Sequence, residues 1–161
     1  MTYDFKTIPS PVGELKLVAS DKGLMAILWE CDLDSDRVKT GTMAEAPDHP
    51  ILVEAARQIG EYFAGQRKAF DVPLDFQGTE FQKSVWAALL TIPFGETRSY
   101  ADIARAVGRP TAFRAVGAAN GRNPISIIAP CHRVIGTSGA LTGFAGGLEA
   151  KQRLLALEGA V

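Results

Sequence analysis

Residues 99–120 read SYADIARAVGRPTAFRAVGAAN, and this stretch predicts two short helices joined by a tight turn. Ser99 and Asp102 have the form of an N-terminal cap, and Gly108 ends the first helix. The second helix is expected over 111–120. Two helices joined in this way outline a helix-turn-helix, whose second helix usually lies in a DNA groove, although many helical hairpins bind nothing.

Charge is distributed unequally along the chain. The net charge is −1, but residues 1–80 carry 8 basic and 14 acidic side chains, whereas residues 81–161 carry 9 basic and 4 acidic ones. Arg114 is the one long charged side chain of the second helix, which is dominated by alanine and glycine and can approach another surface closely. The Lys and Arg residues between 98 and 133 are all arginine, which favours forked recognition of phosphate and suggests a polyanionic partner. A solvated cationic face would explain the charge equally well.

The first half of the chain predicts a small antiparallel sheet covered by one helix. Three strands are expected within residues 2–30, a loop over 31–47, an amphipathic helix over 48–65 that begins at Asp48, and a further strand over 69–76. Together these elements form an α/β N-terminal domain, residues 1–78.

Acidic composition gives way to basic composition at residues 77–78, where we place the domain boundary. Thr79 and Gln82 then have the spacing of a capping box, and helices dominate the rest of the chain. The predicted C-terminal domain, residues 79–161, is mostly α-helical and winged-helix-like, and it contains the helix-turn-helix. A short strand is expected over 125–129.

Composition excludes several classes of protein. The 161 residues are 47% hydrophobic and 22% charged, which is ordinary for a globular protein and excludes intrinsic disorder. No hydrophobic run approaches the roughly 18 residues of a membrane span, and no basic leader is visible, so we expect no membrane association and a cytoplasmic location. Two cysteines and two histidines are too few for a cysteine-rich zinc module, so no metal site is predicted.

Residues 130–134, PCHRV, place a thiol, an imidazole and a guanidinium on consecutive residues. A thiolate is the reactive form of cysteine, and we expect the neighbouring imidazole and positive charge to lower the pKa of Cys131 and remove its proton. The imidazole of His132 in turn needs a carboxylate to orient it, and Glu149 and Glu158 are both candidates. Cys31 stands alone and is expected to be a small buried side chain.

At this motif the sequence resembles the O6-alkylguanine-DNA alkyltransferases, also called methylated-DNA–protein-cysteine methyltransferases. Residues 130–134 match the active-site motif of that family, and the resemblance runs without a gap from about residue 81 to 159. It implies DNA repair in which the damaged nucleotide is flipped out of the duplex. The alkyl group of O6-alkylguanine, and of O4-alkylthymine, then moves irreversibly to the cysteine, with one turnover per protein and no cofactor.

The resemblance also assigns catalytic roles to residues at the matching positions. Cys131 is the nucleophile and methyl acceptor, and His132 deprotonates it through a bridging water. Glu158 holds the imidazole, and Asn123 keeps the turn in shape. Tyr100 helps to rotate the nucleotide and gives the guanine leaving group a proton, although an aromatic residue on the apolar side of a helix is more often part of the core.

The same resemblance places the minor groove of double-stranded DNA against the helix-turn-helix. Arg114 would fill the gap left by the flipped base, although a solvated helix arginine is the alternative. The other contacting residues would be Ser99, Tyr100, Ala112, Ala115, Gly117 and Thr137. The degenerate pattern of the minor groove suits a protein that must find lesions in any sequence.

A glycine-rich stretch, residues 139–147, resembles the family loop that walls the alkylguanine pocket and donates backbone N–H groups to the base. The implied pocket residues are Leu141, Thr142, Phe144, Ala145 and Gly146. Some family members carry tyrosine and serine where this chain has Phe144 and Ala145, so recognition would rely on backbone donors, and Thr142 would narrow the pocket. A phosphate-binding loop would need a Gly-Lys-Ser/Thr ending, which this stretch lacks.

Three other classes of function compete with this interpretation. A catalytically silent lesion-binding relative would lack the acceptor cysteine, and a transcription regulator of this family would carry an additional zinc domain. A cysteine hydrolase would turn over repeatedly on an ester or a peptide. We expect a monomer, and the sequence leaves open whether binding along DNA is cooperative.

Overall fold

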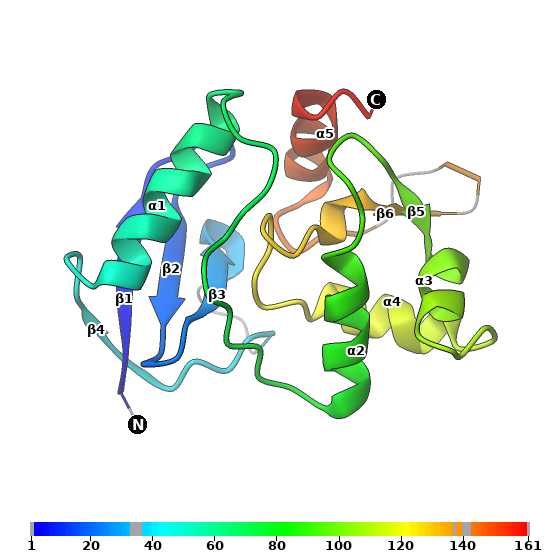
Figure 1. Ribbon diagram of the computed structural model, residues 1–161, viewed down its shortest axis with the longest axis horizontal. Coiled ribbons are helices and arrows are strands. Elements are labelled where there is room, and N and C mark those ends of the chain that lie inside the picture. The colour runs from blue at the N-terminus through cyan, green and yellow to red at the C-terminus, as the bar shows by residue number, and fades with distance from the viewer. Residues whose placement is uncertain (1, 33–36, 137, 140–142, 161) are drawn as a thin grey trace.

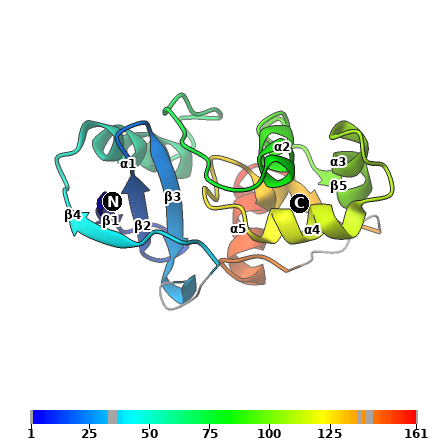
Figure 2. The same cartoon turned by 90° about the horizontal axis from the view of Figure 1, so that it is seen from below.

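The chain forms two halves that lie side by side (Figure 1, Figure 2). The computed structural model describes residues 2–32, 37–136, 138–139 and 143–160. One half is built on a β-sheet with a helix across it, and the other half is helical. The general division expected from the sequence is therefore present.

The sheet has the strand order β3-β2-β1-β4. Its strands are β1 (Thr2–Ile8), β2 (Leu15–Ala19), β3 (Leu24–Trp29) and β4 (Thr42–Glu45). The first three are antiparallel neighbours, as predicted, whereas β4 pairs with β1 in parallel. The prediction of a loop throughout 31–47 is therefore wrong at β4. This short segment has no periodic pattern of its own, and it becomes a strand because β1 offers it an unpaired edge.

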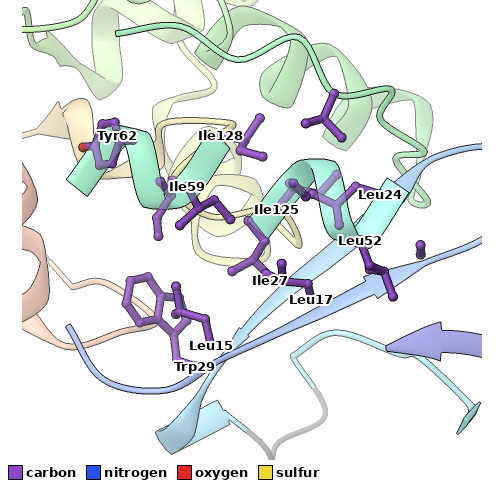
Figure 3. Close-up of a cluster of buried hydrophobic side chains, with 14 of the residues drawn as sticks. Leu15, Leu17, Leu24, Ile27, Trp29, Leu52, Ile59, Tyr62, Ile125 and Ile128 are labelled. Atoms are coloured by element: carbon purple, nitrogen blue, oxygen red, sulfur yellow. The ribbon is translucent and has the colours of Figure 1, made fainter. Parts of the chain in front are cut away.

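Helix α1 (Pro50–Phe63) lies across one face of the sheet (Figure 1). Its N-cap is His49 and not Asp48 as predicted, because the Nδ1 atom of His49 accepts a hydrogen bond from the backbone N–H of Ile51 at 3.2 Å. The helix buries four apolar side chains at helical spacing, Leu52, Ala55, Ile59 and Tyr62, together with the polar Gln58. Figure 3 shows Leu52 and Ile59 in one cluster with side chains of the strands and with Ile125 and Ile128, so both halves of the chain build this core.

The predicted strand over 69–76 is wrong. The segment is extended, but its only β-bridge joins Leu74 to Leu24. The backbone N–H of Leu24 donates to the carbonyl of Pro73, and Pro73 itself has no N–H to offer to a ladder. The segment therefore runs beside β3 as a connection between the two halves.

Within its described residues, the helical half contains four α-helices and two short strands paired in parallel. The helices are α2 (Glu80–Leu89), α3 (Tyr100–Ala106), α4 (Phe113–Gly121) and α5 (Leu148–Leu157), and the strands are β5 (Arg98–Ser99) and β6 (Val134–Ile135). The capping boxes predicted at Thr79 and Ser99 are both confirmed. Helices α3 and α4 pack against each other and against α2, which is the arrangement of a helix-turn-helix with a supporting helix.

Candidate active site

The chain turns sharply just before the predicted nucleophile. The expected strand over 125–129 is wrong, because Ile125 makes a single β-bridge to Ile27 and the following residues form turns. Within this buried turn Ile127 adopts a positive φ of 76°. A β-branched residue reaches this conformation only at a cost, so the surroundings must impose it.

Asn123 holds the turn at both ends. Its Oδ1 atom accepts from the backbone N–H of Ile125 at 3.1 Å, and its Nδ2 atom donates to the carbonyl of Ala129 at 2.8 Å. Asn123 is fully buried, and the N-terminal half reaches it through Arg37, whose Nη1 atom donates to the Asn123 carbonyl at 2.7 Å. These contacts fix the turn that leads into Cys131.

Cys131 begins the short helix η2 (Cys131–Arg133), and its side chain is buried. Burial raises the pKa of its thiol, and hydrogen bonds from the side chains of Asn123 and Ser126 offset this effect only in part. The prediction that neighbouring positive charge lowers the pKa of Cys131 is therefore wrong, because desolvation outweighs that charge. The thiol needs a base to remove its proton.

His132, the predicted base, is fully buried. Its Nε2 atom lies 2.7 Å from Oε2 of Glu158, whereas Glu149 is exposed, so the choice left open by the sequence falls on Glu158. Burial lowers the pKa of His132 despite the adjacent carboxylate, so the ring is neutral at pH 7. Because a carboxylate only accepts hydrogen bonds, the ring proton lies on Nε2. The buried Nδ1 atom carries the lone pair and has no hydrogen-bond partner among the described residues.

Glu158, the C-cap of α5, is the centre of a buried hydrogen-bond network. Arg133 donates to it from Nε at 2.7 Å and from Nη2 at 2.9 Å, and the hydroxyl of Tyr62 donates from α1 at 2.6 Å. Burial opposes ionisation of Glu158, but the hydrogen bonds from His132 and Arg133 outweigh it and lower the pKa of the carboxyl to about 2. Arg133 is thus buried against a carboxylate, which removes it from the arginines that could bind phosphate.

Lys151 is a buried charge that sequence analysis missed. Its Nζ atom donates to the carbonyl of Val134 at 2.7 Å, and burial lowers its pKa. The positive charge of Lys151 favours the thiolate of Cys131. Its position between Ala150 and Leu154, on the buried stripe of α5, was the signal that could have revealed it.

The predicted DNA-contacting residues lie on α3, on α4 and just before each helix. Arg114 and Ala115 are exposed on α4, and Tyr100 at the start of α3 is half-buried. Gly117 faces that tyrosine, because a Cβ atom at Gly117 would lie 3.8 Å from the ring. Phe113, which is 51% exposed at the start of α4, was not singled out from the sequence.

Two further residues predicted to contact DNA, Ser99 and Ala112, stand at helix N-termini. The Ser99 hydroxyl accepts from the backbone N–H of Asp102 at 3.1 Å and so caps α3, and Ala112 is the N-cap residue of α4. Four arginines of the helical half are exposed around these helices: Arg105, Arg109, Arg114 and Arg122. Arg105 is also paired with Asp102 on its own helix, and Arg98, which is less exposed, is paired with Glu96.

The loop predicted to wall the substrate pocket is described from residue 143 onward. Three half-buried residues of this loop, Phe144, Ala145 and Gly146, lie near the end of β3. Cys31, two residues after β3, contacts Ala145. Cys31 is exposed and not buried as predicted, because it lies on the short helix η1 (Glu30–Asp32) at the surface. Leu141, Thr142 and the predicted DNA contact Thr137 lie outside the described residues.

The described residues contain no group of three or more His, Cys, Asp or Glu side chains that could hold a metal ion. Over the same parts of the chain, no helix has the length and apolar character needed to cross a membrane. Both cysteines are free thiols.

Comparison with known proteins identifies the family. The sequence model of the 6-O-methylguanine DNA methyltransferase DNA binding domain matches residues 80–160, and that of the ribonuclease-like domain of the same enzyme matches residues 4–76. The chain belongs to the O6-methylguanine DNA methyltransferase family. This membership confirms the predicted fold class, an α/β N-terminal domain followed by a helical DNA-binding domain, and the predicted class of enzyme, a DNA repair methyltransferase.

Individual relatives of this methyltransferase family match nearly the whole chain. The methylated-DNA–protein-cysteine methyltransferase of Mycolicibacterium paratuberculosis is 51% identical over 96% of this chain and 92% of the relative. The enzyme of that name from Methanosarcina acetivorans is 50% identical over 93% of this chain and 94% of the relative. The crystal structure of Mycobacterium tuberculosis OGT in complex with DNA superimposes with a TM-score of 0.86, at 48% identity, over 99% of this chain and 94% of that chain.

Proposed function

We propose that this methyltransferase repairs DNA by moving the methyl group of O6-methylguanine, and of O4-methylthymine, onto Sγ of its own Cys131. The thiolate attacks the methyl carbon, the S–C bond forms, and the C–O bond to the base breaks with its electron pair. The product is a thioether, which lacks the hydrolysable ester of a cysteine hydrolase, so each protein reacts once. No cofactor takes part in this scheme.

The observation that carries the proposal is the buried arrangement of Cys131, His132 and Glu158. A neutral imidazole with its proton on Nε2 and a lone pair on Nδ1 can take the thiol proton through a bridging water. The Glu158 carboxylate stabilises the imidazolium that results. The raised pKa of Cys131 keeps the thiol protonated until substrate is bound, and the charge of Lys151 favours the thiolate once the proton has left.

We further propose that helices α3 and α4 bind the minor groove of double-stranded DNA with the damaged base flipped out. Arg114 is exposed on a helix of small residues and would occupy the gap in the duplex. Tyr100 lies beside Gly117 at the junction of the two helices, where it would assist rotation of the nucleotide and donate a proton to the departing guanine. Ser99, Ala112, Ala115 and Thr137 would complete the contact surface.

The flipped base would enter a pocket walled by the loop that includes Phe144, Ala145 and Gly146, with Leu141 and Thr142 earlier in the same loop.

We also propose that residues 1–78 and 79–161 form separate domains. A Cβ atom at Gly78 would come within 2.6 Å of the Trp86 ring, so glycine lets the connecting segment pass close to α2 where the helical half begins. We also propose that the protein is monomeric and cytoplasmic. The reaction needs one acceptor cysteine and double-stranded DNA, and it does not need a second copy of the chain.

The test is the intact mass of the protein before and after incubation with a duplex that carries one O6-methylguanine. We expect a gain of one methyl group in place of one thiol hydrogen, never more than one per protein. Cys131→Ser should abolish the gain. The matched variant Cys31→Ser should retain it, because Cys31 is exposed and far in sequence from the His132 base.

A chain that binds the duplex but gains no mass would be a lesion-binding protein, and the proposal would fail. A gain that persists in Cys131→Ser would assign the acceptor to another residue. Repeated turnover on an ester or a peptide would instead favour a cysteine hydrolase.

A further inference from the structure

Three consecutive residues of the pocket-wall loop lie against the end of β3. The ring of Phe144 meets that of Trp29 edge-on, with centroids 5.4 Å apart and planes at 71°. The Cys31 thiol donates to the carbonyl of Ala145 at 3.2 Å. Gly146 lies directly on the indole, because a Cβ atom there would come within 2.6 to 2.8 Å of three of its ring atoms. The N-terminal half therefore supports this loop.

Trp29 also contacts the turn that carries the nucleophile. Its side chain is 2% exposed, and its Nε1 atom donates to Oγ of Ser126 at 3.1 Å. Ser126 belongs to the buried turn that leads into Cys131. Figure 3 shows Trp29 at the opposite end of the buried cluster from Leu24 and Leu52. One rigid side chain thus touches both the loop and the turn.

Phe144 contacts two of the buried hydrophobic clusters. It packs against the core that contains Trp29 and also against the core that contains Cys131. A shift of Phe144 relative to the indole therefore also changes the packing of the second core, to which Cys131 belongs. Because protein interiors are close-packed, a change of this kind alters the space left for a substituent that enters there.

We propose that Trp29 is a positioning residue that sets the width of the alkyl pocket, and with it the size of the O6 substituent that the chain accepts. The inference rests on the proposed function, since it concerns the same site. An indole anchored by Ser126 and covered by Gly146 has little freedom to move. A smaller ring at position 29 lets the loop settle toward β3 and widens the pocket, whereas a side chain added at position 146 pushes the loop toward the thiol.

The test measures single-turnover transfer from two duplexes that differ only in the lesion, O6-methylguanine or O6-benzylguanine. Rates are taken over a range of DNA concentrations, so that the dissociation constant is separated from the transfer rate at saturation. Trp29→Phe should raise the ratio of the benzyl to the methyl transfer rate about tenfold, the scale of effect expected when a pocket changes by about one carbon group. Gly146→Ala should lower the ratio, and the dissociation constants should not change.

The double variant Trp29→Phe with Gly146→Ala should give a ratio between those of the single variants, because the smaller ring makes room for the added methyl group. Leu52→Val is the matched control: it trims the same core at its far end and lowers stability without touching the loop or the turn. It should leave the ratio unchanged.

An unchanged ratio in Trp29→Phe, or the same change in Leu52→Val, would overturn the positioning role and leave Trp29 as a core residue only. A wild-type chain that takes up no methyl group would instead overturn the proposed function. The two failures are distinguished by the methyl substrate alone.

Discussion

Replacing Tyr62 with phenylalanine tests how strongly the N-terminal half stabilises the buried charge of Glu158. The phenylalanine ring keeps the contacts of Tyr62 with Phe63, Phe70 and Phe94, so the change removes one hydrogen bond and little else. That bond is 2.6 Å long, is buried and ends on a carboxylate. A hydrogen bond to a charged group contributes about 1.5–3 kcal/mol.

Because Arg133 and His132 continue to donate to Glu158, we expect Tyr62→Phe to lower the free energy of unfolding by about 2 kcal/mol, near the middle of that range. Urea unfolding at pH 7 with linear extrapolation measures this loss, and the dependence on denaturant should keep its slope. Tyr3→Phe is the matched control, since the Tyr3 hydroxyl on β1 has no hydrogen bond within the described residues. If the two variants differ by less than about 0.5 kcal/mol, the hydroxyl of Tyr62 does not stabilise Glu158, and our account of the network is wrong.

Three further outcomes follow from the charges at the site. Burial lowers the pKa of His132 from 6.5, so as the pH falls the unfolded chain takes up a proton before the folded chain does. The contribution of His132 to the free energy of unfolding is therefore fully present above pH 6.5. Below pH 6.5 the free energy of unfolding declines by up to about 1.4 kcal/mol per pH unit. Urea titrations from pH 7.5 to 5 should show this decline, and His132→Gln should flatten it. Lys151→Met removes a charge that favours the Cys131 thiolate, so methyl transfer at pH 7 should slow several-fold and its pH dependence should move upward; equal rates at every pH would contradict this role. If the four exposed arginines neutralise phosphates, log K for DNA should fall with log salt at a slope of roughly −4, and a slope near zero would remove the DNA surface from α3 and α4.

Structural features whose interacting residues lie within a few positions of each other could be predicted from the sequence. The capping boxes at Thr79 and Ser99 join residues three positions apart, so both partners are visible in one short window. The apolar stripe of α1 is visible for the same reason. Strand β4 was missed because it depends on the free edge of β1, whose paired residues lie 40 positions earlier in the chain.

The electrostatics of the candidate site could not be predicted from the sequence. The motif at residues 130–134 identified the thiol and the imidazole, yet sequence neighbours suggested a lowered pKa for Cys131, whereas burial raises it. The partner of His132 lies 26 residues away, so residue spacing alone left Glu149 and Glu158 open, and Glu158 came only from the family resemblance before the fold was known. Tyr62 belongs to the apolar stripe of α1 by pattern, and nothing in that pattern indicates that its hydroxyl meets a carboxylate 96 residues later.

The N-terminal half contributes to the site by contacts that end on the groups next to the reaction centre. Tyr62 donates a hydrogen bond to Glu158, Trp29 donates one to Ser126, and Arg37 donates one to the carbonyl of Asn123. Each target belongs to a feature that is costly alone: a buried carboxylate, or the turn that holds Ile127 at a positive φ. Hydrogen bonds from the other half offset these costs, so the geometry around Cys131 depends on the docking of both halves. Substitutions elsewhere on the N-terminal surface should therefore leave the transfer rate unchanged, whereas these three positions connect that half to the chemistry.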